Sequence, residues 1–306
     1  MTERKPKIAV IGAGLMGHGI AQVFALAGHD VTIYDAAQTS LDTVKDRILT
    51  NLKDLGDDQS AVNRVTPEAD LGKAVADSDY VVEAVLEDLP LKQRLFDEIE
   101  QHVRPDTILA SNTSVIPITD IMQGLKHRER ALGTHWWNPP FLVPLVEVIE
   151  TEWTSAEAVA FTMKLHADAG KQPAHVKKDV PGFIGNRLQH ALWREAVSLV
   201  EHGICDAETV DNVIKAAFGR RLAVLGPLEN ADMVGTDLTL AIHKIVLPAI
   251  DSRPGPSPYL EKLVADGKLG FKSGEGFRTW TPEQQTELRA KVLKHLKKAR
   301  EDDVKQ

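Results

Sequence analysis

Short apolar runs and a glycine-rich turn alternate at the start of the chain. Residues 7–11 (KIAVI) are apolar and rich in β-branched side chains, which predicts a buried strand. Residues 12–17 (GAGLMG) follow directly, and residues 19–27 (GIAQVFALA) have the composition of a helix. Residues 31–34 predict a second strand, which ends at Asp35. The pattern therefore predicts strand, glycine turn, helix, strand and acidic residue in that order.

The alternation continues to about residue 180. Further runs that predict strands lie at residues 80–86, 107–111, 131–135 and 143–149, and stretches that predict helices lie at residues 91–103 and 116–124. Strands that alternate with helices are typical of a mostly parallel sheet covered on both faces. We therefore expect an α/β, Rossmann-type domain over residues 1–180.

The pattern changes at residues 177–182 (KKDVPG), where Pro and Gly interrupt both helical and strand periodicity. Beyond this connector, helical patterns occupy residues 184–201, 206–218, 236–250 and 281–306, with little strand signal. We expect an all-α C-terminal domain over residues 181–306.

Composition narrows the function classes. The 306 residues are 43% hydrophobic and 26% charged, which is typical of a globular chain of two domains. The net charge of −8 disfavours nucleic-acid binding, which needs clustered cations. Apolar runs are too short for a membrane span or a signal peptide. A single cysteine, Cys205, excludes an internal disulfide, so we expect a cytoplasmic protein.

The glycine turn has the spacing of a dinucleotide site. Gly12 permits the tight turn, Gly14 lets the backbone approach a pyrophosphate, and Gly17 lets the helix pack closely. Leu15 and Met16 lie in the same turn and are candidate contacts. The free N–H groups of the helix N-terminus favour phosphates. The alternative is an ordinary βα turn without a ligand.

Asp35 lies about 20 residues beyond the turn, at the end of the second predicted strand. Its carboxylate can accept hydrogen bonds from both ribose hydroxyls and would repel a 2′-phosphate. We therefore expect NAD rather than NADP, with a surface aspartate as the alternative.

His135 ends an apolar run, and Glu147 interrupts another (LVEVI). A carboxylate within a buried strand is costly unless it is paired, and an imidazole is the economical partner. Such a pair holds the imidazole in one tautomer and stabilises its charged form. A base of this kind suits the oxidation of an alcohol by NAD. The alternative is a core histidine and a glutamate that faces water.

Several motifs occur together in one order. They are SNTS at 111–114, GTHWWNP at 133–139, LVEV at 145–148, PGFIGNR at 181–187, GP at 226–227 and GFKSGEGF at 270–277. In order and spacing the set resembles the L-3-hydroxyacyl-CoA dehydrogenase superfamily over nearly the whole chain. This resemblance implies NAD-dependent oxidation and a homodimer that forms through the helical domain.

The resemblance also implies roles for single residues. His135 is implied to be the catalytic base, and Glu147 its orienting partner. Ser114, Asn138 and Asn186 match polar residues around the substrate oxygen and the nicotinamide, so Ser114 and Asn138 are candidate contacts of the cofactor as well. Each has a simpler alternative: Ser114 and Asn186 as helix caps, and Asn138 as a turn residue.

Glu87 and Lys92 follow the predicted strand at 80–86 and match cofactor contacts of the same family. The alternative for Lys92 is a solvated side chain.

Three departures from the family pattern concern the substrate. The segment between Asp35 and Tyr80 lacks the long, lysine-bearing insert of acyl-CoA members, and residues 51–59 carry more acid than base. The doubled proline at 139–140 is more similar to relatives that oxidise free hydroxy acids or alcohols. Phe271 stands where the family usually has Lys or Arg.

The expected function is oxidation of the 3-hydroxyl of a short-chain L-3-hydroxyacyl-CoA to the 3-keto product, as in fatty acid metabolism. The alternative is a free hydroxy acid or alcohol that resembles gulonate, carnitine or a pyridine alcohol. A non-catalytic protein that binds the nucleotide, as the lens crystallins related to this family do, is the contrasting class. No metal is expected.

Asp35 generates a prediction about the cofactor. We expect NAD to bind at least tenfold more tightly than NADP, a difference on the order of 1.4 kcal/mol, because of the like-charge contact with the 2′-phosphate. Fluorescence titration with both cofactors measures the ratio. Equal affinities would contradict the assignment.

Overall fold

The computed structural model describes residues 4–304 and divides into two compact units. One unit contains the described residues up to Arg187 together with those from Leu293 onward, and the other contains Leu188–Val292. Residues 293–304 group with the first unit because Arg300 forms an ion pair with Asp57 there, at 2.8 Å.

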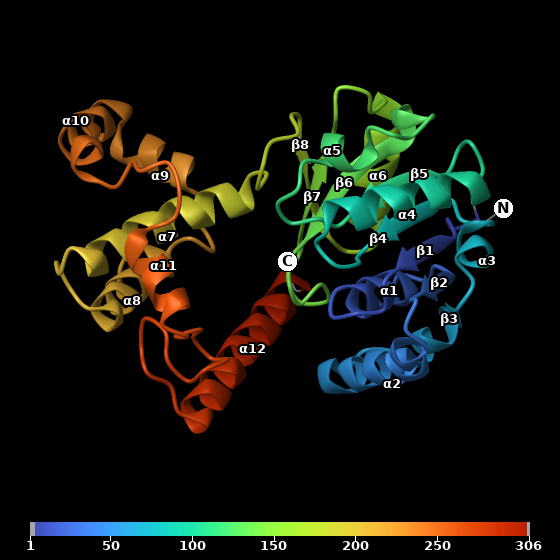
Figure 1. Cartoon of the computed structure of the whole chain (residues 1–306), viewed down its shortest axis with the longest axis horizontal. Coiled ribbons are helices and arrows are strands. Elements are labelled where there is room, and N and C mark those ends of the chain that lie inside the picture. The colour runs from blue at the N-terminus through green and yellow to red at the C-terminus, as the bar shows by residue number, and fades with distance from the viewer. Residues whose placement is uncertain (1–3, 305–306) are drawn as a thin grey trace. The chain divides into compact units, whose positions relative to one another are not determined.

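The first unit is built on one eight-stranded sheet in the order β3-β2-β1-β4-β5-β6-β7-β8 (Figure 1). The strands are β1 Ile8–Ile11, β2 Val31–Tyr34, β3 Val65–Glu68, β4 Tyr80–Glu83, β5 Ile108–Ser111, β6 Ala131–Trp136, β7 Leu145–Ile149 and β8 Gln172–Val176. β1 to β6 are parallel, β7 is antiparallel to β6, and β8 is parallel to β7. The first six strands have the order of a dinucleotide-binding sheet, so the predicted Rossmann-type fold is confirmed.

Helices cover both faces of this sheet. They are α1 Gly17–Leu26, α2 Gln38–Leu55, α3 Leu71–Val75, α4 Leu89–His102, α5 Ile118–Met122 and α6 Ala156–Asp168, with short 3₁₀ turns at Gln59–Arg64 and Arg128–Arg130. Side chains of α1, α2 and α6 pack with Ile8 and Val10 of β1, whereas those of α3, α4 and α5 pack with Ala9 and Ile11. Alternate residues of each strand therefore supply two separate cores.

The second unit is helical, as predicted. α7 Gly185–Glu201 and α12 Pro282–Val304 each have residues in both units, and α8 Ala207–Ala216, α9 Pro227–Val234, α10 Thr236–Val246 and α11 Pro258–Ala265 lie within the second unit, with 3₁₀ turns at Phe218–Arg220 and Leu247–Ala249. Asp206 caps α8 by accepting the Thr209 N–H at 2.7 Å. α10 ends earlier than the predicted residue 250, because Pro248 lacks the N–H that the helix would need.

The glycine turn between β1 and α1 leads to a paired prediction. A Cβ at Gly17 would lie 1.7 Å from the Gly12 carbonyl oxygen, whereas a Cβ at Gly14 would have no atom within 4 Å. We expect Gly17→Ala to lower the free energy of unfolding by several kcal/mol, because backbone must move. Gly14→Ala should leave stability within about 1 kcal/mol of the parent yet weaken NAD binding at least tenfold, because the added methyl group would lie where the sequence analysis expects the pyrophosphate.

Thermal unfolding and NAD titration of the two variants measure these effects. Equal destabilisation by both substitutions would contradict the distinct roles of the two glycines.

Candidate active site

The predicted site residues gather at the carboxyl ends of the parallel strands. The glycine turn follows β1, Asp35 follows β2, Glu87 follows β4, Ser114 follows β5, and His135 lies at the end of β6. The strand order reverses between β1 and β4, which is where ligands bind to open α/β sheets.

The glycine turn is held against the end of β2. Gly12 has a φ of +106°, and a Cβ there would lie 2.7 Å from the Ala84 carbonyl oxygen. The Asp35 carboxylate accepts the N–H groups of Ala13 at 2.7 Å and Ala37 at 2.8 Å. Asp35 is therefore fixed beside the turn by its own backbone contacts, in the place where a ribose-binding carboxylate is expected.

Three apolar side chains at this edge of the sheet face solvent. Leu15, Leu86 and Val115 follow β1, β4 and β5 and are 67%, 78% and 49% exposed. Met16 instead packs against the core beside α1. The space beside Gly14 is open. Exposed apolar groups next to it fit a bound dinucleotide, whose flat rings would cover them. Leu86 and Val115 escaped the sequence analysis, although their position directly after buried strands was a usable signal.

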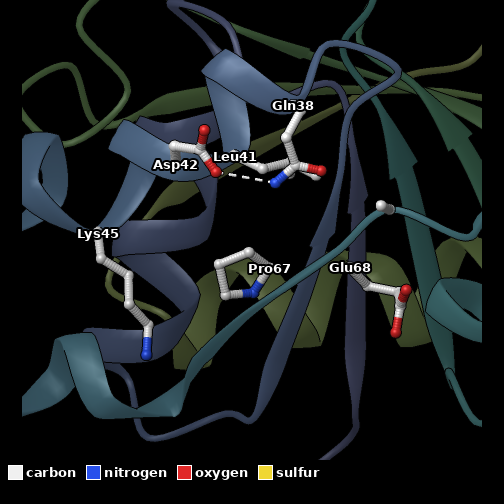
Figure 2. Close-up of a pocket in the computed structure, with 7 residues that line it drawn as sticks. Gln38, Leu41, Asp42, Lys45, Pro67 and Glu68 are labelled. Atoms are coloured by element: carbon white, nitrogen blue, oxygen red, sulfur yellow. Dashed lines mark hydrogen bonds between the residues drawn. The ribbon is translucent and has the colours of Figure 1, made fainter.

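A pocket of about 390 Å³ lies between α2 and the end of β3 (Figure 2). Gln38 donates to Asp42 at 2.8 Å on its helical wall. The charged side chains that line it are Asp42, Glu68 and Lys45. Two carboxylates and one ammonium make this pocket unfavourable for binding a phosphate.

His135 and Glu147 are opposite each other on the antiparallel strands β6 and β7. His135 Nδ1 lies 2.7 Å from Glu147 Oε2, and the two residues are 4% and 1% exposed. The other oxygen, Oε1, accepts the N–H groups of Ile184 at 2.8 Å and Gly185 at 3.0 Å. Burial alone would raise the pKa of Glu147, but the bonds from His135 and the two backbone N–H groups outweigh it and lower the pKa below its ordinary value.

Two aromatic rings lie against the imidazole. The ring centroids of Trp137 and Phe183 are 5.3 and 5.6 Å from that of His135. Phe183 has a φ of +50°, a conformation that costs energy in a bulky residue, and it directly precedes the two N–H groups that hold Glu147. Because Nδ1 is engaged by Glu147, Nε2 is the ring nitrogen left for a ligand.

Ser114 and Asn186 are brought together, because Asn186 Nδ2 donates to the Ser114 carbonyl oxygen at 2.9 Å. Neither residue acts as a helix cap: Asn186 lies within α7, and Pro117 occupies the N-cap of α5. Asn138 is exposed and lies in the bend that follows β6, where its peptide bond to Pro139 is cis. Its contact with substrate or cofactor stays a prediction.

Lys92 is enclosed rather than solvated. Its Nζ lies 2.6 Å from Glu83 Oε1 and 3.3 Å from Glu87 Oε2, and its side chain is 1% exposed. Glu87 Oε1 accepts the Thr113 hydroxyl at 2.6 Å and the Ser114 N–H at 2.8 Å. These hydrogen bonds and the Lys92 charge outweigh the effect of burial and lower the pKa of Glu87.

Glu87 thus holds the turn that contains Ser114, and Lys92 anchors Glu87. Contact of either side chain with the cofactor stays a prediction. Glu83, which the sequence analysis did not single out, is the buried carboxylate on which this network rests; an acidic residue within an apolar strand was the signal.

Within residues 4–304, no group of three or more His, Cys, Asp or Glu side chains is arranged to hold a metal ion. No helix in that range is long and apolar enough to cross a bilayer.

Comparison with known families matches both parts of the chain. Residues 7–180 match the 3-hydroxyacyl-CoA dehydrogenase NAD-binding domain, and residues 182–280 match the C-terminal domain of the same family. A probable 3-hydroxybutyryl-CoA dehydrogenase of Deinococcus radiodurans is 39% identical over 280 residues, which cover 89% of this chain and 99% of that protein.

Another relative acts on a pyridine derivative. The 5-formyl-3-hydroxy-2-methylpyridine 4-carboxylate 5-dehydrogenase of Mesorhizobium japonicum is 37% identical over 294 residues, 94% of this chain and 95% of that protein. A crystal structure of a dehydrogenase of this name, described as an NAD⁺-dependent dismutase, superimposes with a TM-score of 0.91 at 36% identity, covering 98% of this chain and 99% of that chain. A 3-hydroxybutyryl-CoA dehydrogenase from Ralstonia eutropha gives a TM-score of 0.77 at 30% identity, covering 91% and 100%.

The two matched domains are those of a dehydrogenase family that binds NAD. The glycine turn and the exposed apolar groups beside it fit this cofactor. The chain belongs to the 3-hydroxyacyl-CoA dehydrogenase family and is an NAD-dependent oxidoreductase that acts on a CH–OH group.

Proposed function

We propose that His135 is the general base that accepts the hydroxyl proton of the substrate, and that Glu147 orients it. The observation that carries this proposal is the buried pair, 2.7 Å apart, at the same sheet edge as the glycine turn. NAD, when bound, supplies the hydride acceptor. A base within reach of the hydroxyl is what the protein must add.

The surroundings of His135 suit this role. Glu147 holds Nδ1 as a donor, so Nε2 presents its lone pair to the substrate, and the carboxylate stabilises the imidazolium that forms. Trp137 and Phe183 keep bulk water from the ring. Ser114, Asn138 and Asn186 are proposed to contact the substrate oxygen and the nicotinamide.

For the substrate, we propose a small hydroxylated acid or alcohol that does not carry coenzyme A. The turn after α2 is acidic and is already engaged by α12: Arg300 bonds both Asp57 oxygens at 2.8 and 2.9 Å, and Lys297 donates to the Asp54 carbonyl oxygen at 3.0 Å. The pocket between α2 and the end of β3 adds two carboxylates, of Asp42 and Glu68. Three phosphates of coenzyme A would find few free cations here.

The likeness to the pyridine-carboxylate dehydrogenase supports this proposal, because it extends over 98% of this chain. Residues 281–306, which include the α12 turns that contact α2, lie beyond both matched family regions.

A short-chain 3-hydroxyacyl-CoA is the second candidate. The family match over residues 7–280 favours it, with relatives that include the Deinococcus enzyme. The His135–Glu147 chemistry is the same for both candidates, so the difference lies only in how the rest of the substrate is held.

We also propose a cytoplasmic homodimer that forms mainly through residues beyond 181. The second unit exposes many large apolar side chains, and those on α10 are Leu238, Leu240, Ile242, Ile245 and Val246. A helical unit of this size makes only a small core alone, so a second copy would cover them.

Substitutions at the pair test the chemistry. We expect His135→Gln to lower kcat by roughly 10²–10⁴ with NAD affinity retained, because the base is lost. Glu147→Gln should also lower kcat, because the imidazole loses its orienting charge. Steady-state rates and NAD titration measure both effects, and near-normal turnover of His135→Gln would show that the pair is structural.

Pairs of substrates with and without coenzyme A test the proposal that the natural substrate does not carry it. We expect measurable turnover of acetoacetyl-CoA with a high KM, and at least equal kcat/KM for free keto acids or for pyridine alcohols and aldehydes. NADH absorbance is followed at two salt concentrations. A thioester preferred by several orders of magnitude, with a KM that rises steeply with salt, would establish the second candidate instead.

Oligomeric state is the third measurement. We expect a dimer at micromolar concentration by light scattering, with an apolar interface of about 2,000 Å² or more in total. Ile245→Asp should shift the population toward monomer, because a charge at a covered apolar position is costly. A monomeric wild type would refute the proposal.

A further inference from the structure

Lys171 is a buried cation outside the site described above. It lies between α6 and β8 and is 9% exposed. Among the residues that the structure describes, no carboxylate lies within ion-pair distance of it. Its Nζ donates instead to two backbone carbonyls, of Pro140 at 2.7 Å and of Val143. A charged group buried with only neutral partners carries a cost that needs a reason.

Both acceptors belong to the loop of residues 137–144, which joins β6 to β7. Within it, the N–H groups of Leu142 and Val143 donate to the Pro139 carbonyl oxygen, each at 3.0 Å. The loop contains one tight turn, and two carbonyls of the loop, those of Pro140 and Val143, accept from the ammonium. Lys171 thereby bonds the turn from inside the protein.

The connection between two paired strands helps to set their register, and this loop connects β6 to β7. His135 is the register partner of Glu147 across these two strands. A slip of one residue in a paired strand would turn each side chain to the opposite face, and the pair would be lost. Lys171 also lies over the Trp136 ring, 5.3 Å from its centroid, next to His135 in the chain.

We propose that Lys171 is a positioning residue: its ammonium fixes the 137–144 turn and so keeps His135 opposite Glu147. This inference rests on the proposed role of His135 as the base. Lys171 itself touches neither of the two side chains, so it acts only through the loop.

The charge of Lys171 makes this contact sensitive to alkaline pH. Burial, with a smaller contribution from the positive charge of Arg300 on α12, lowers the pKa of Lys171 to about 8. His166 on α6 also senses the charge of Lys171, and its ring centroid is 5.1 Å from that of Trp136. Burial lowers the pKa of His166 to about 4, so it stays uncharged where Lys171 titrates.

If activity falls at alkaline pH because Lys171 loses its proton, unfolding is not the cause. The folded-state pKa lies below the unfolded value of 10.5, so between these two pH values the unfolded chain binds more protons. Deprotonation of Lys171 therefore favours the folded state, while the charge-assisted bonds to the loop weaken. Stability and activity should change in opposite directions through this group.

The test compares Lys171→Met and Lys171→Arg with Lys164→Met, an exposed lysine of α6. We expect Lys171→Met to lower kcat about 10- to 100-fold with the KM for NAD within threefold, because misplaced groups lose rate steeply. Hydrogen exchange at Leu142 and Val143 should be faster in this variant. Lys171→Arg should keep part of the rate and lose the wild-type decline above pH 8, because guanidinium stays charged. Lys164→Met should behave as wild type.

A kcat within threefold of wild type, or unchanged protection of Leu142 and Val143, would overturn the proposal. Should Lys171→Met not fold, the wild type decides: protection of these two amides, corrected for the intrinsic rate, must fall between pH 7 and 9.5, and constant protection refutes the role of the ammonium. Normal turnover of His135→Gln would refute the proposed base, whereas the exchange data would still report on the loop.

Discussion

A buried carboxylate that needs three donors organises this molecule. Glu147 has its side chain inside a sheet, where an unpaired charge costs several kcal/mol. His135 satisfies one oxygen, and the first amides of the segment that begins α7 satisfy the other. The same charge therefore orients the imidazole and holds the start of the helix that leads into the second unit. The positive φ of Phe183 is tolerated because this backbone conformation directs the N–H groups of Ile184 and Gly185 at the Glu147 carboxylate.

The parts that could be predicted from sequence have a local signal. The glycine turn, Asp35 and the strands that carry them depend on residues within one βα unit, and α7, α8, α10 and α12 have clear helical periodicity. β3 and β8 were not predicted, because VTPE and QPAHV contain few apolar residues and acquire their strand conformation from a neighbouring strand. The sequence analysis also does not predict α2, α3, α6, α9 and α11. The sequence of α2 is largely polar, and α3, α9 and α11 have only 5, 8 and 8 residues.

Contacts between different helices and strands explain what else the pattern could not reveal. Lys92 looks like an ordinary helical lysine until β4 and α4 place it against Glu83 and Glu87. The spacing of His135 and Glu147 suggested a pair, but only the antiparallel β6–β7 arrangement explains why they meet. The sequence analysis treats the excess of acid in residues 51–59 only as the lack of a basic surface. In the structure, Lys297 and Arg300 of α12 bond Asp54 and Asp57 there.

The direct opposition of His135 and Glu147 across a hairpin constrains how this sequence can change. Loops usually tolerate insertions and deletions, but adding or removing one residue between positions 137 and 144 would threaten to turn the imidazole toward the face where Trp136 packs with Phe24, at 5.6 Å. The length of this loop is thus under a stricter constraint than its composition. Variation in substrate among descendants of this sequence should arise by substitution within the loop, whereas length differences should accumulate elsewhere, as between β2 and β4.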